Sequence, residues 1–292
     1  MSDHGRALSS RPGLAFAALF GGNVALAFGP WMVRLSDVGP VAAGFWRLAI
    51  GLPFLMLLAK ATRTPVPPMK RALWVTLAIG GLFFAADLGA WHAGIHHTRL
   101  ANATLFGNVA SFIFVIYGFV VARRRPSRMQ IGAFALAIAG VALLMGRSYE
   151  LSAKNLIGDL LCLAAGIFYF FYLVAIDRAR GLMQPLPTLV ISTAFGVLPL
   201  LAIAWMLGER ILPGDWTPLV LLAIGSQVVG QGLLVYAIGH LSPVIVGLGL
   251  LTQPAIAAVI GWSAYGERLT PADMAGMIAI GAALILVRLP AK

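Results

Sequence analysis

The fold is decided by a stretch that occurs twice, whose first copy, residues 93–141, reads AGIHHTRLANATLFGNVASFIFVIYGFVVARRRPSRMQIGAFALAIAGV. The second copy follows at residues 237–285, at an offset of 144 positions. Upstream of both copies, the tetrapeptide LAIG at residues 77–80 recurs at residues 222–225. The offset is close to half of the 292-residue chain. Self-similarity at a fixed period indicates a duplicated unit.

The composition assigns the chain to the membrane. Hydrophobic residues make up 60% of it and charged residues 11%, whereas about a quarter of the residues of a soluble domain are charged. The net charge of +11 does not indicate nucleic acid binding, because the cations lie in short segments between apolar runs. The single cysteine, Cys162, excludes an internal disulfide and a thiolate metal cluster. It lies in an apolar run and is predicted to be a packing residue.

Ten apolar runs are long enough to span a bilayer, which takes about 20 residues. We expect helices at residues 13–33, 40–59, 72–92, 98–121, 128–146, 156–176, 186–207, 217–238, 242–264 and 270–288. A β-barrel would instead show alternating segments of about ten residues. The first run follows two arginines, as in a signal peptide, but it has the length of a full span, so we expect it to be retained.

The repeat gives each half five helices, and we expect the two repeats to be residues 1–146 and 147–292. Of the 21 Lys and Arg residues, 14 fall on the side of the N-terminus, six on the opposite side and one, Arg47, within a predicted helix. Both termini should therefore be cytoplasmic, with the protein in the cell inner membrane. Since five is odd, the second repeat enters the membrane from the opposite side. Inverted repeats around a central cavity are typical of secondary transporters.

Arg47 is the deepest charge in the sequence, close to the middle of the second predicted helix. An arginine at the bilayer centre costs roughly 2.5–3.5 kcal/mol, so it needs a partner or an anionic ligand. Substrate binding and a structural pair with a carbonyl group or with Asp87 both satisfy this need. Asp87 is also the best candidate for carrying a coupled proton. For Asp159, which lies near a helix start, the sequence predicts a helix-dipole or capping role.

Uncharged polar residues gather at mid-membrane depth on five predicted helices, which favours a wet cavity. Some of them could instead join helices through hydrogen bonds worth about 0.6 kcal/mol each. Two aromatic residues near matching positions of the repeats are further cavity candidates. The predicted substrate-binding residues are Arg47, Asn23, Asp87, Trp91, Asn108, Tyr169, Gln227, Gln231, Tyr236, Thr252 and Gln253.

Glycine and proline pairs interrupt matching helices of the two repeats, a pattern that marks substrate handling in transporters. They predict hinges at Gly51 and Pro53 in the second helix and at Gly196 and Pro199 in the seventh. Pro254 should widen the ninth helix. The alternative is that these prolines have no special role, because proline is common in membrane helices.

Small residues four positions apart predict a helix pair. Ala135 and Ala139 lie on one face of the fifth helix, and Ala279 and Ala283 lie on one face of the tenth. Such spacing permits close approach of two backbones. We therefore expect the fifth and tenth helices to pack against each other.

Other chemistries have weak support. His92, His96 and His97 lack the carboxylates or thiolates that would complete a metal site, so we expect no metal and no cofactor. The sequence has no glycine-rich phosphate loop and no nucleophile motif of known hydrolases. A carrier of phosphorylated substrates would need several buried cations, and only Arg47 qualifies.

Two segments resemble a known family. They are Ala264-Tyr265-Gly266-Glu267-Arg268-Leu269-Thr270, which leads to Gly276, and Phe45-Trp46-Arg47-Leu48-Ala49. Both are similar to the drug/metabolite transporter superfamily, EamA type, and the resemblance covers the whole chain. It implies ten helices in two inverted halves and a secondary carrier that exports small metabolites. The chain looks most like the YddG-type exporters of aromatic and other neutral amino acids. The first repeat departs from the family pattern with Ala110 in place of proline and Arg123 in place of glutamate.

The sequence thus predicts an all-α integral membrane protein that exports small amphipathic metabolites, foremost neutral and aromatic amino acids, by alternating access. Nucleosides, nucleotide-sugars or drugs are alternative substrates. An intramembrane enzyme is the rival class, but we expect no catalytic activity. The expected partners are a small-molecule substrate and the lipid bilayer, without nucleic acid, and a monomer is compatible with all of these features.

Overall fold

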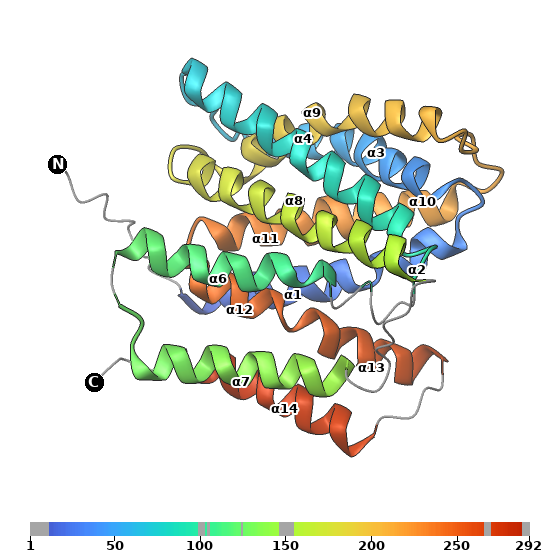
Figure 1. The fold of residues 1–292 in the computed structure, drawn as a ribbon. Helices are drawn as coiled ribbons and strands as arrows, with labels where there is room; N and C mark the ends of the chain where they lie inside the picture. The colour runs from blue at the N-terminus through green and yellow to red at the C-terminus, as the bar shows by residue number, and fades with distance from the viewer. Residues whose placement is uncertain are drawn as a thin grey trace. The chain divides into compact units, whose positions relative to one another are not determined.

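The structure is a computed structural model that describes residues 12–98, 103, 106–123, 125–145, 155–265 and 270–287. All secondary structure in these residues is helical (Figure 1). The elements are α1 (Pro12–Ala27), α2 (Gly29–Leu35), α3 (Pro40–Ala61), α4 (Arg71–Gly94), α6 (Val109–Ala122), α7 (Arg128–Met145), α8 (Leu156–Arg180), α9 (Pro185–Met206), α10 (Thr217–Leu222), the π-helix η1 (Ala223–Gly230), α11 (Gln231–Ile238), α12 (Pro243–Leu250), α13 (Gln253–Tyr265) and α14 (Pro271–Leu286).

The described helices account for the ten predicted spans. Six helical segments are long and apolar enough to cross a membrane, and four shorter apolar helices occur among the described residues. Each of the ten overlaps one predicted run, so the prediction of an all-α membrane protein is confirmed. In the fourth span, α6 begins at Val109, and residues 99–102, 104 and 105 lie outside the described residues.

Three of the predicted spans, 13–33, 217–238 and 242–264, contain an interruption or a change of helix type that the sequence analysis did not specify. Phe28 separates α1 from α2, because Pro30 in the first turn of α2 lacks an amide hydrogen. The eighth span passes from α10 through the π-helix η1 into α11. The ninth span breaks at Leu251 and Thr252, directly before Pro254 in the first turn of α13.

The chain forms two compact units, and each draws on both halves of the sequence. The first unit combines Met1–Ala85 with Phe171–Ser242, and the second combines Ala86–Phe170 with Pro243–Lys292. The predicted repeat boundary at residues 146/147 lies outside the described residues. The division into repeats 1–146 and 147–292 therefore stays a prediction.

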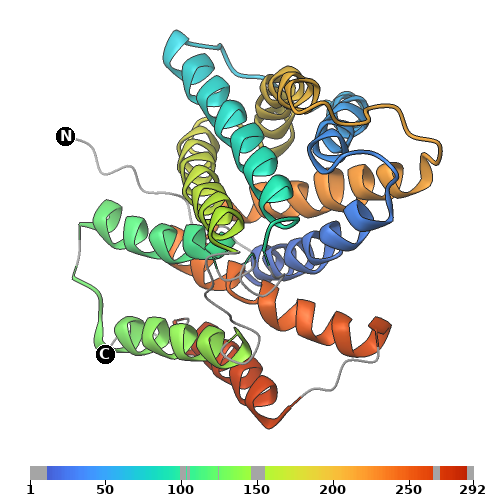
Figure 2. The ribbon, with the colours of Figure 1, turned by 45° about the vertical axis from the view of Figure 1, so that its right-hand side comes forward.

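In the first unit, α3 packs along α9, and α1 packs against η1 and α11. Figures 1 and 2 both show α3 and α9 side by side. Glycines make these contacts close: a Cβ atom at Gly196 would lie 2.8 Å from Leu48 Cδ1, and one at Gly22 would lie 3.0 Å from the Gly230 carbonyl oxygen. Larger residues at these glycines would push the helices apart.

In the second unit, α6 packs against α12 and α7 packs against α14. The prediction that the fifth and tenth helices pair is confirmed, and both ribbon views show α7 beside α14. We predicted that α7 contacts α14 through the face that carries Ala135 and Ala139. This prediction was wrong, because both alanines are exposed. The backbones instead meet at Gly140 and Gly276, where a Cβ on either glycine would lie 2.7–2.8 Å from the carbonyl oxygen of the other.

The start of α3 is capped from a distant part of the first unit. The N-cap residue Gly39 has no side chain that could accept the first amides of the helix. Glu209, in the loop after α9, accepts from Val41 N at 3.2 Å and from Ala42 N at 2.7 Å. A carboxylate at this position also complements the positive end of the helix dipole.

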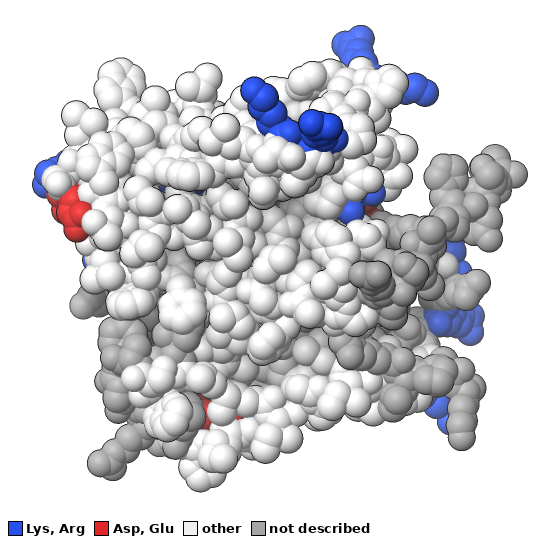
Figure 3. Space-filling view, turned by 180° about the vertical axis from the view of Figure 1, so that it is seen from behind, with Lys and Arg blue, Asp and Glu red and all other residues white. Residues whose placement is uncertain are grey.

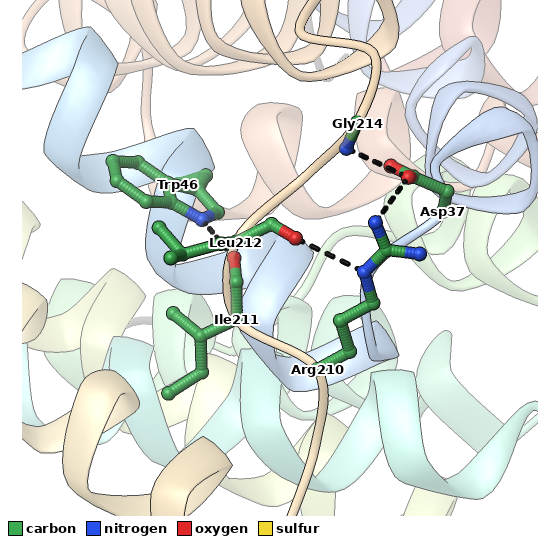
Figure 4. Close-up of polar contacts among 6 residues, drawn as sticks. All are labelled: Asp37, Trp46, Arg210, Ile211, Leu212 and Gly214. Carbon is green, nitrogen blue, oxygen red and sulfur yellow. Dashed lines mark hydrogen bonds and ion pairs between the residues drawn. The ribbon is translucent and has the colours of Figure 1, made fainter.

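Further contacts join the loop before α3, and Trp46 on α3 itself, to the loop after α9 (Figure 4). Asp37 accepts from Gly214 N at 2.7 Å and forms an ion pair with Arg210 at 3.2 Å. Trp46 Nε1 donates to the Ile211 carbonyl oxygen at 2.7 Å. The Gly214 hydrogen bond, assisted by the Arg210 charge, holds the pKa of Asp37 below its ordinary value. We call Asp37, Trp46 and residues 209–214 the loop clamp.

Candidate functional site

The predicted deep arginine has a polar partner in the first unit. Arg47, on α3, is 7% exposed, and its Nε donates to Gln227 Oε1 at 3.2 Å. Gln227 lies on η1 and donates through Nε2 to Thr193 Oγ1 on α9 at 2.9 Å. Both partners are fully buried. A guanidinium held in this way keeps its orientation inside an apolar protein, where an unpartnered charge would be costly.

Aromatic rings extend this arrangement. The guanidinium carbon of Arg47 lies 5.6 Å from the centre of the Phe84 ring on α4, within the range of a cation–π interaction. Phe84 stacks on Tyr172 of α8 with ring centres 4.5 Å apart. Tyr172 Oη donates to Gln231 Oε1 on α11 at 3.4 Å. These contacts connect six buried residues, which we call the Arg47 network: Arg47, Gln227, Thr193, Phe84, Tyr172 and Gln231.

The π-helix and a glycine position Gln227. A π-helix has a wider turn than an α-helix, and such segments occur frequently at functional sites. Gly51 on α3 faces this segment, and a Cβ there would lie 2.9 Å from Gln227 Cγ. The glycine therefore leaves the space that the Gln227 side chain occupies. Without that space, Gln227 could not lie between Arg47 and Thr193.

Five of the eleven predicted binding residues belong to the first unit. The structure connects three of them, Arg47, Gln227 and Gln231, in the Arg47 network. Asn23, on α1, is 1% exposed. Tyr236, on α11, is half-buried and stacks on His240 with ring centres 4.3 Å apart.

The other six predicted residues belong to the second unit, and two of them lie where spans are interrupted. Asn108 is a turn residue directly before α6, and Thr252 is a turn residue between α12 and α13. Both are buried, and the Thr252 hydroxyl donates to the Gly249 carbonyl oxygen at 2.6 Å. They occupy equivalent repeat positions, so both copies interrupt the helix at the same place. Interrupted helices whose ends present backbone polar groups are typical of substrate sites in transporters.

The remaining four residues of the second unit are half-buried: Asp87, Trp91, Tyr169 and Gln253. Trp91 packs with Phe106 against the buried side chains of Ile95 and Cys162. A Cβ at Gly107 would lie 3.3 Å from Trp91 Nε1, so the indole lies close to the chain just before Asn108. Asp159, in the first turn of α8, accepts a hydrogen bond from Thr98 Oγ1 at 2.6 Å, and its predicted helix-dipole or capping role stays a prediction.

The predicted hinges show close packing at the glycines and unbroken helices at two of the prolines. Helix α3 continues through Pro53, and α9 continues through Pro199. Gly51 makes room for Gln227, and Gly196 makes room for Leu48. Hinge motion at these positions stays a prediction. Pro254, by contrast, lies at the interruption of the ninth span.

Sequence reasoning missed three members of the Arg47 network: Thr193, Phe84 and Tyr172. Thr193 and its neighbour Ser192 are polar residues inside an apolar span and are buried, which is a signal that could have identified them. The two aromatic residues carry no such signal, because aromatic residues in membrane helices more often pack against other helices or lipid. Among the described residues, no three His, Cys, Asp or Glu side chains come close enough to hold a metal ion.

Comparison with known proteins defines the class of protein. The sequence pattern of the EamA-like transporter family matches the chain twice, at residues 13–146 and 156–289. The chain therefore belongs to the EamA-like transporter family, whose architecture is ten helices in two repeats. The segment 266–269, which carried part of the resemblance, lies outside the described residues.

Two individual proteins are similar to this chain. An uncharacterized transporter of Archaeoglobus fulgidus is 23% identical over 243 residues, which cover 81% of this chain and 83% of that protein. A chain of known crystal structure superposes with a TM-score of 0.76 at 18% identity, over 98% of each chain. At that identity, the superposition supports the fold alone.

Proposed function

We propose that this transporter exports small amphipathic metabolites, foremost neutral and aromatic amino acids, by alternating access across the inner membrane, with both termini in the cytoplasm. The observation that carries the proposal is the Arg47 network. It combines a buried guanidinium with two stacked aromatic rings in one compact unit. The substrate class follows from these two kinds of group.

The guanidinium supplies recognition of a carboxylate. Arginine binds carboxylates through two parallel hydrogen bonds, and charge-assisted bonds of this kind are roughly twice as strong as neutral ones. Gln227 accepts from Nε, so it fixes the plane of the Arg47 guanidinium. A planar, fixed donor group discriminates a carboxylate from a hydroxyl or an amine.

The aromatic rings supply the apolar half of the site. Phe84 and Tyr172 stack on each other beside Arg47. Their faces suit an apolar or aromatic side chain, because such rings bury a large area and prefer stacked or edge contacts. Since Arg47 and both rings are almost fully buried, a substrate reaches them only when the surrounding helices move, as alternating access requires.

The test is flux in proteoliposomes that contain the purified protein. Vesicles loaded with labelled phenylalanine should exchange it for external phenylalanine or leucine. Phenethylamine, which lacks the carboxylate, should compete at least about tenfold more weakly, the factor that corresponds to 1.4 kcal/mol. Exchange of uridine or a cationic dye without amino-acid exchange would contradict the substrate class. Chemical conversion of a solute without flux would contradict transport itself.

A further inference from the structure

A second site lies in the first unit, away from the Arg47 network. It is a pocket of about 420 Å³ at the ends of the membrane helices, where the α3–α4 loop meets the turn between α8 and α9. Its lining includes Pro65 and Pro67 of the loop, Arg180 at the end of α8, Gln184 before α9 and His240 after α11. Two nitrogen-bearing side chains of basic character, Arg180 and His240, thus face one pocket.

Contacts with the backbone hold Arg180 in place. Its Nε donates to the Val235 carbonyl oxygen at 2.9 Å, and its Nη1 donates to the carbonyl oxygen of Met183. The guanidinium lies directly over Gly239, where a Cβ atom would collide with it. These three neighbours fix both the position and the plane of the Arg180 guanidinium, so the charge is part of a built pocket wall.

His240 is also oriented. Its Nδ1 lies 2.8 Å from the Tyr236 carbonyl oxygen, and its ring packs on the Tyr236 ring at 4.3 Å. A carbonyl oxygen can only accept, so Nδ1 carries the hydrogen of this bond. No described residue forms a hydrogen bond with Nε2 of His240, which accepts from a ligand donor when the imidazole is neutral and donates to a ligand oxygen when it is an imidazolium.

The surroundings of the pocket are strongly basic. The flanking segments 60–71 and 177–184 contain six Lys and Arg residues and one carboxylate, Asp177, which is buried at 4% exposure. Figure 3 shows Lys and Arg side chains grouped at the upper right, over the α3–α4 loop and the start of α4. The positive end of the α9 dipole, which starts at Pro185, adds to this potential. The site therefore favours an anion.

Two large hydrophobic residues at the pocket are exposed. Val66, between the lining residues Pro65 and Pro67, is 58% exposed, and the lining residue Leu182 is 66% exposed. Cations beside exposed apolar side chains match a molecule with a negative head and apolar tails. Basic pockets between membrane helices are known to bind lipid head groups.

We propose that this pocket binds the phosphate head group of an anionic phospholipid, with Arg180 and His240 as its ligands and Val66 and Leu182 against its acyl chains. The lipid stabilises the turn between α8 and α9 against the α3–α4 loop. A free phosphate ion shares the head-group chemistry but lacks the apolar half, so the two sources can be separated by experiment.

The test is native mass spectrometry of the purified full-length protein, incubated with dioleoylphosphatidylglycerol, with dioleoylphosphatidylcholine or with inorganic phosphate. We expect retention of phosphatidylglycerol in preference to phosphatidylcholine, and about tenfold weaker retention in Arg180→Gln and in His240→Gln. Arg180→Lys should retain more lipid than Arg180→Gln, because it keeps the charge. The matched control is Arg178→Gln, which removes an exposed cation two residues away on the same helix.

Equal retention by the wild type, Arg180→Gln and His240→Gln would overturn the proposal, as would an equal loss in Arg178→Gln. If the protein binds inorganic phosphate but does not prefer phosphatidylglycerol to phosphatidylcholine, the ligand of the pocket is a free phosphate ion and not a lipid head group. If Arg180→Gln does not fold, His240→Gln decides, because the His240 side chain makes one hydrogen bond in the described structure. None of these readouts measures transport, so they are independent of the proposed function.

Discussion

Arg47 shows how a single charge is accommodated among membrane helices. One of its hydrogen-bond partners is the neutral side-chain amide of Gln227, and the ring of Phe84 lies within cation–π range. The depth of Arg47 in the second apolar run is visible in the sequence. Its partners are not, because Gln227 lies 180 positions away and many polar residues have the same predicted depth. Only the packing of α3 against η1 selects Gln227 among them.

The first prediction concerns this side chain. Arg47→Ala should reduce amino-acid exchange at least tenfold, because a hydrogen bond to a charged group is worth about 1.5–3 kcal/mol. The variant should still insert and purify as a single species. Arg34→Ala is the control, since it removes an exposed cation. Wild-type exchange by Arg47→Ala in proteoliposomes would rule out a role for Arg47 in binding.

A second prediction at this scale concerns Asp87, the proton-coupling candidate. We expect wild-type transport to ignore a pH gradient, because efflux down a metabolite gradient needs no coupled ion. Accumulation of labelled substrate with and without an imposed gradient measures this. If the gradient does drive accumulation, the expectation is wrong, and Asp87→Asn should then lose gradient-driven accumulation while it keeps gradient-free exchange.

Among the elements, the helices themselves were predictable and their interruptions only partly so. The apolar runs identified all ten spans, because length and composition suffice for that purpose. Pro30 and Pro254 are visible markers of two interruptions. The π-helix η1 has no comparable marker, since its residues Ala223–Gly230 also fit an α-helix. In the structure, Gly51 of α3 packs closely against Gln227 in this segment.

That contact leads to a prediction. Gly51→Ala should displace the Gln227 side chain. The overpacking should lower the free energy of unfolding by about 1–3 kcal/mol, and amino-acid exchange should become slower. Gly232→Ala is the matched control, because it lies on the adjoining helix α11 with no atom within 4 Å of its Cβ position. Unfolding temperature and exchange rate would be measured for both. Identical behaviour of the two variants would contradict the role of Gly51.

The α7–α14 contact can be tested in the same way. Gly140→Ala places a methyl group 2.8 Å from the Gly276 carbonyl oxygen, so it should lower stability by about 1–3 kcal/mol. Gly132→Ala on the same helix meets no atom within 4 Å and should leave stability unchanged. Fluorescence-detected unfolding of both purified variants gives the comparison. A stable Gly140→Ala protein would mean that the two helices separate at little cost.

For the whole molecule, the distribution of Lys and Arg predicts that both termini are cytoplasmic. The protein has one cysteine, the buried Cys162, so a cysteine-free background needs one substitution. In that background, a membrane-impermeant maleimide added to intact cells should label Arg210→Cys in the loop clamp. It should not label Arg63→Cys after α3 until the cells are opened. The reverse pattern would invert the topology.

The duplication was visible in the sequence, but the way in which the two copies combine was not. Periodicity compares a residue with its equivalent 144 positions later and contains no information on which helices touch. In the structure, α3 pairs with α9, α6 with α12 and α7 with α14, so equivalent helices of the two copies become neighbours. The sequence halves therefore do not correspond to the compact units.

This interleaving has a consequence for biosynthesis. The first unit requires residues 171–242 as well as residues up to Ala85, so its early helices leave the ribosome long before their partners. At about 5–20 residues per second, the ribosome needs several seconds to produce the intervening segment. During that interval, α3 is in the bilayer without α9, and its start lacks the carboxylate of Glu209. A ribosome that stalls between the two segments would thus leave helices that lipids or an insertase must shield.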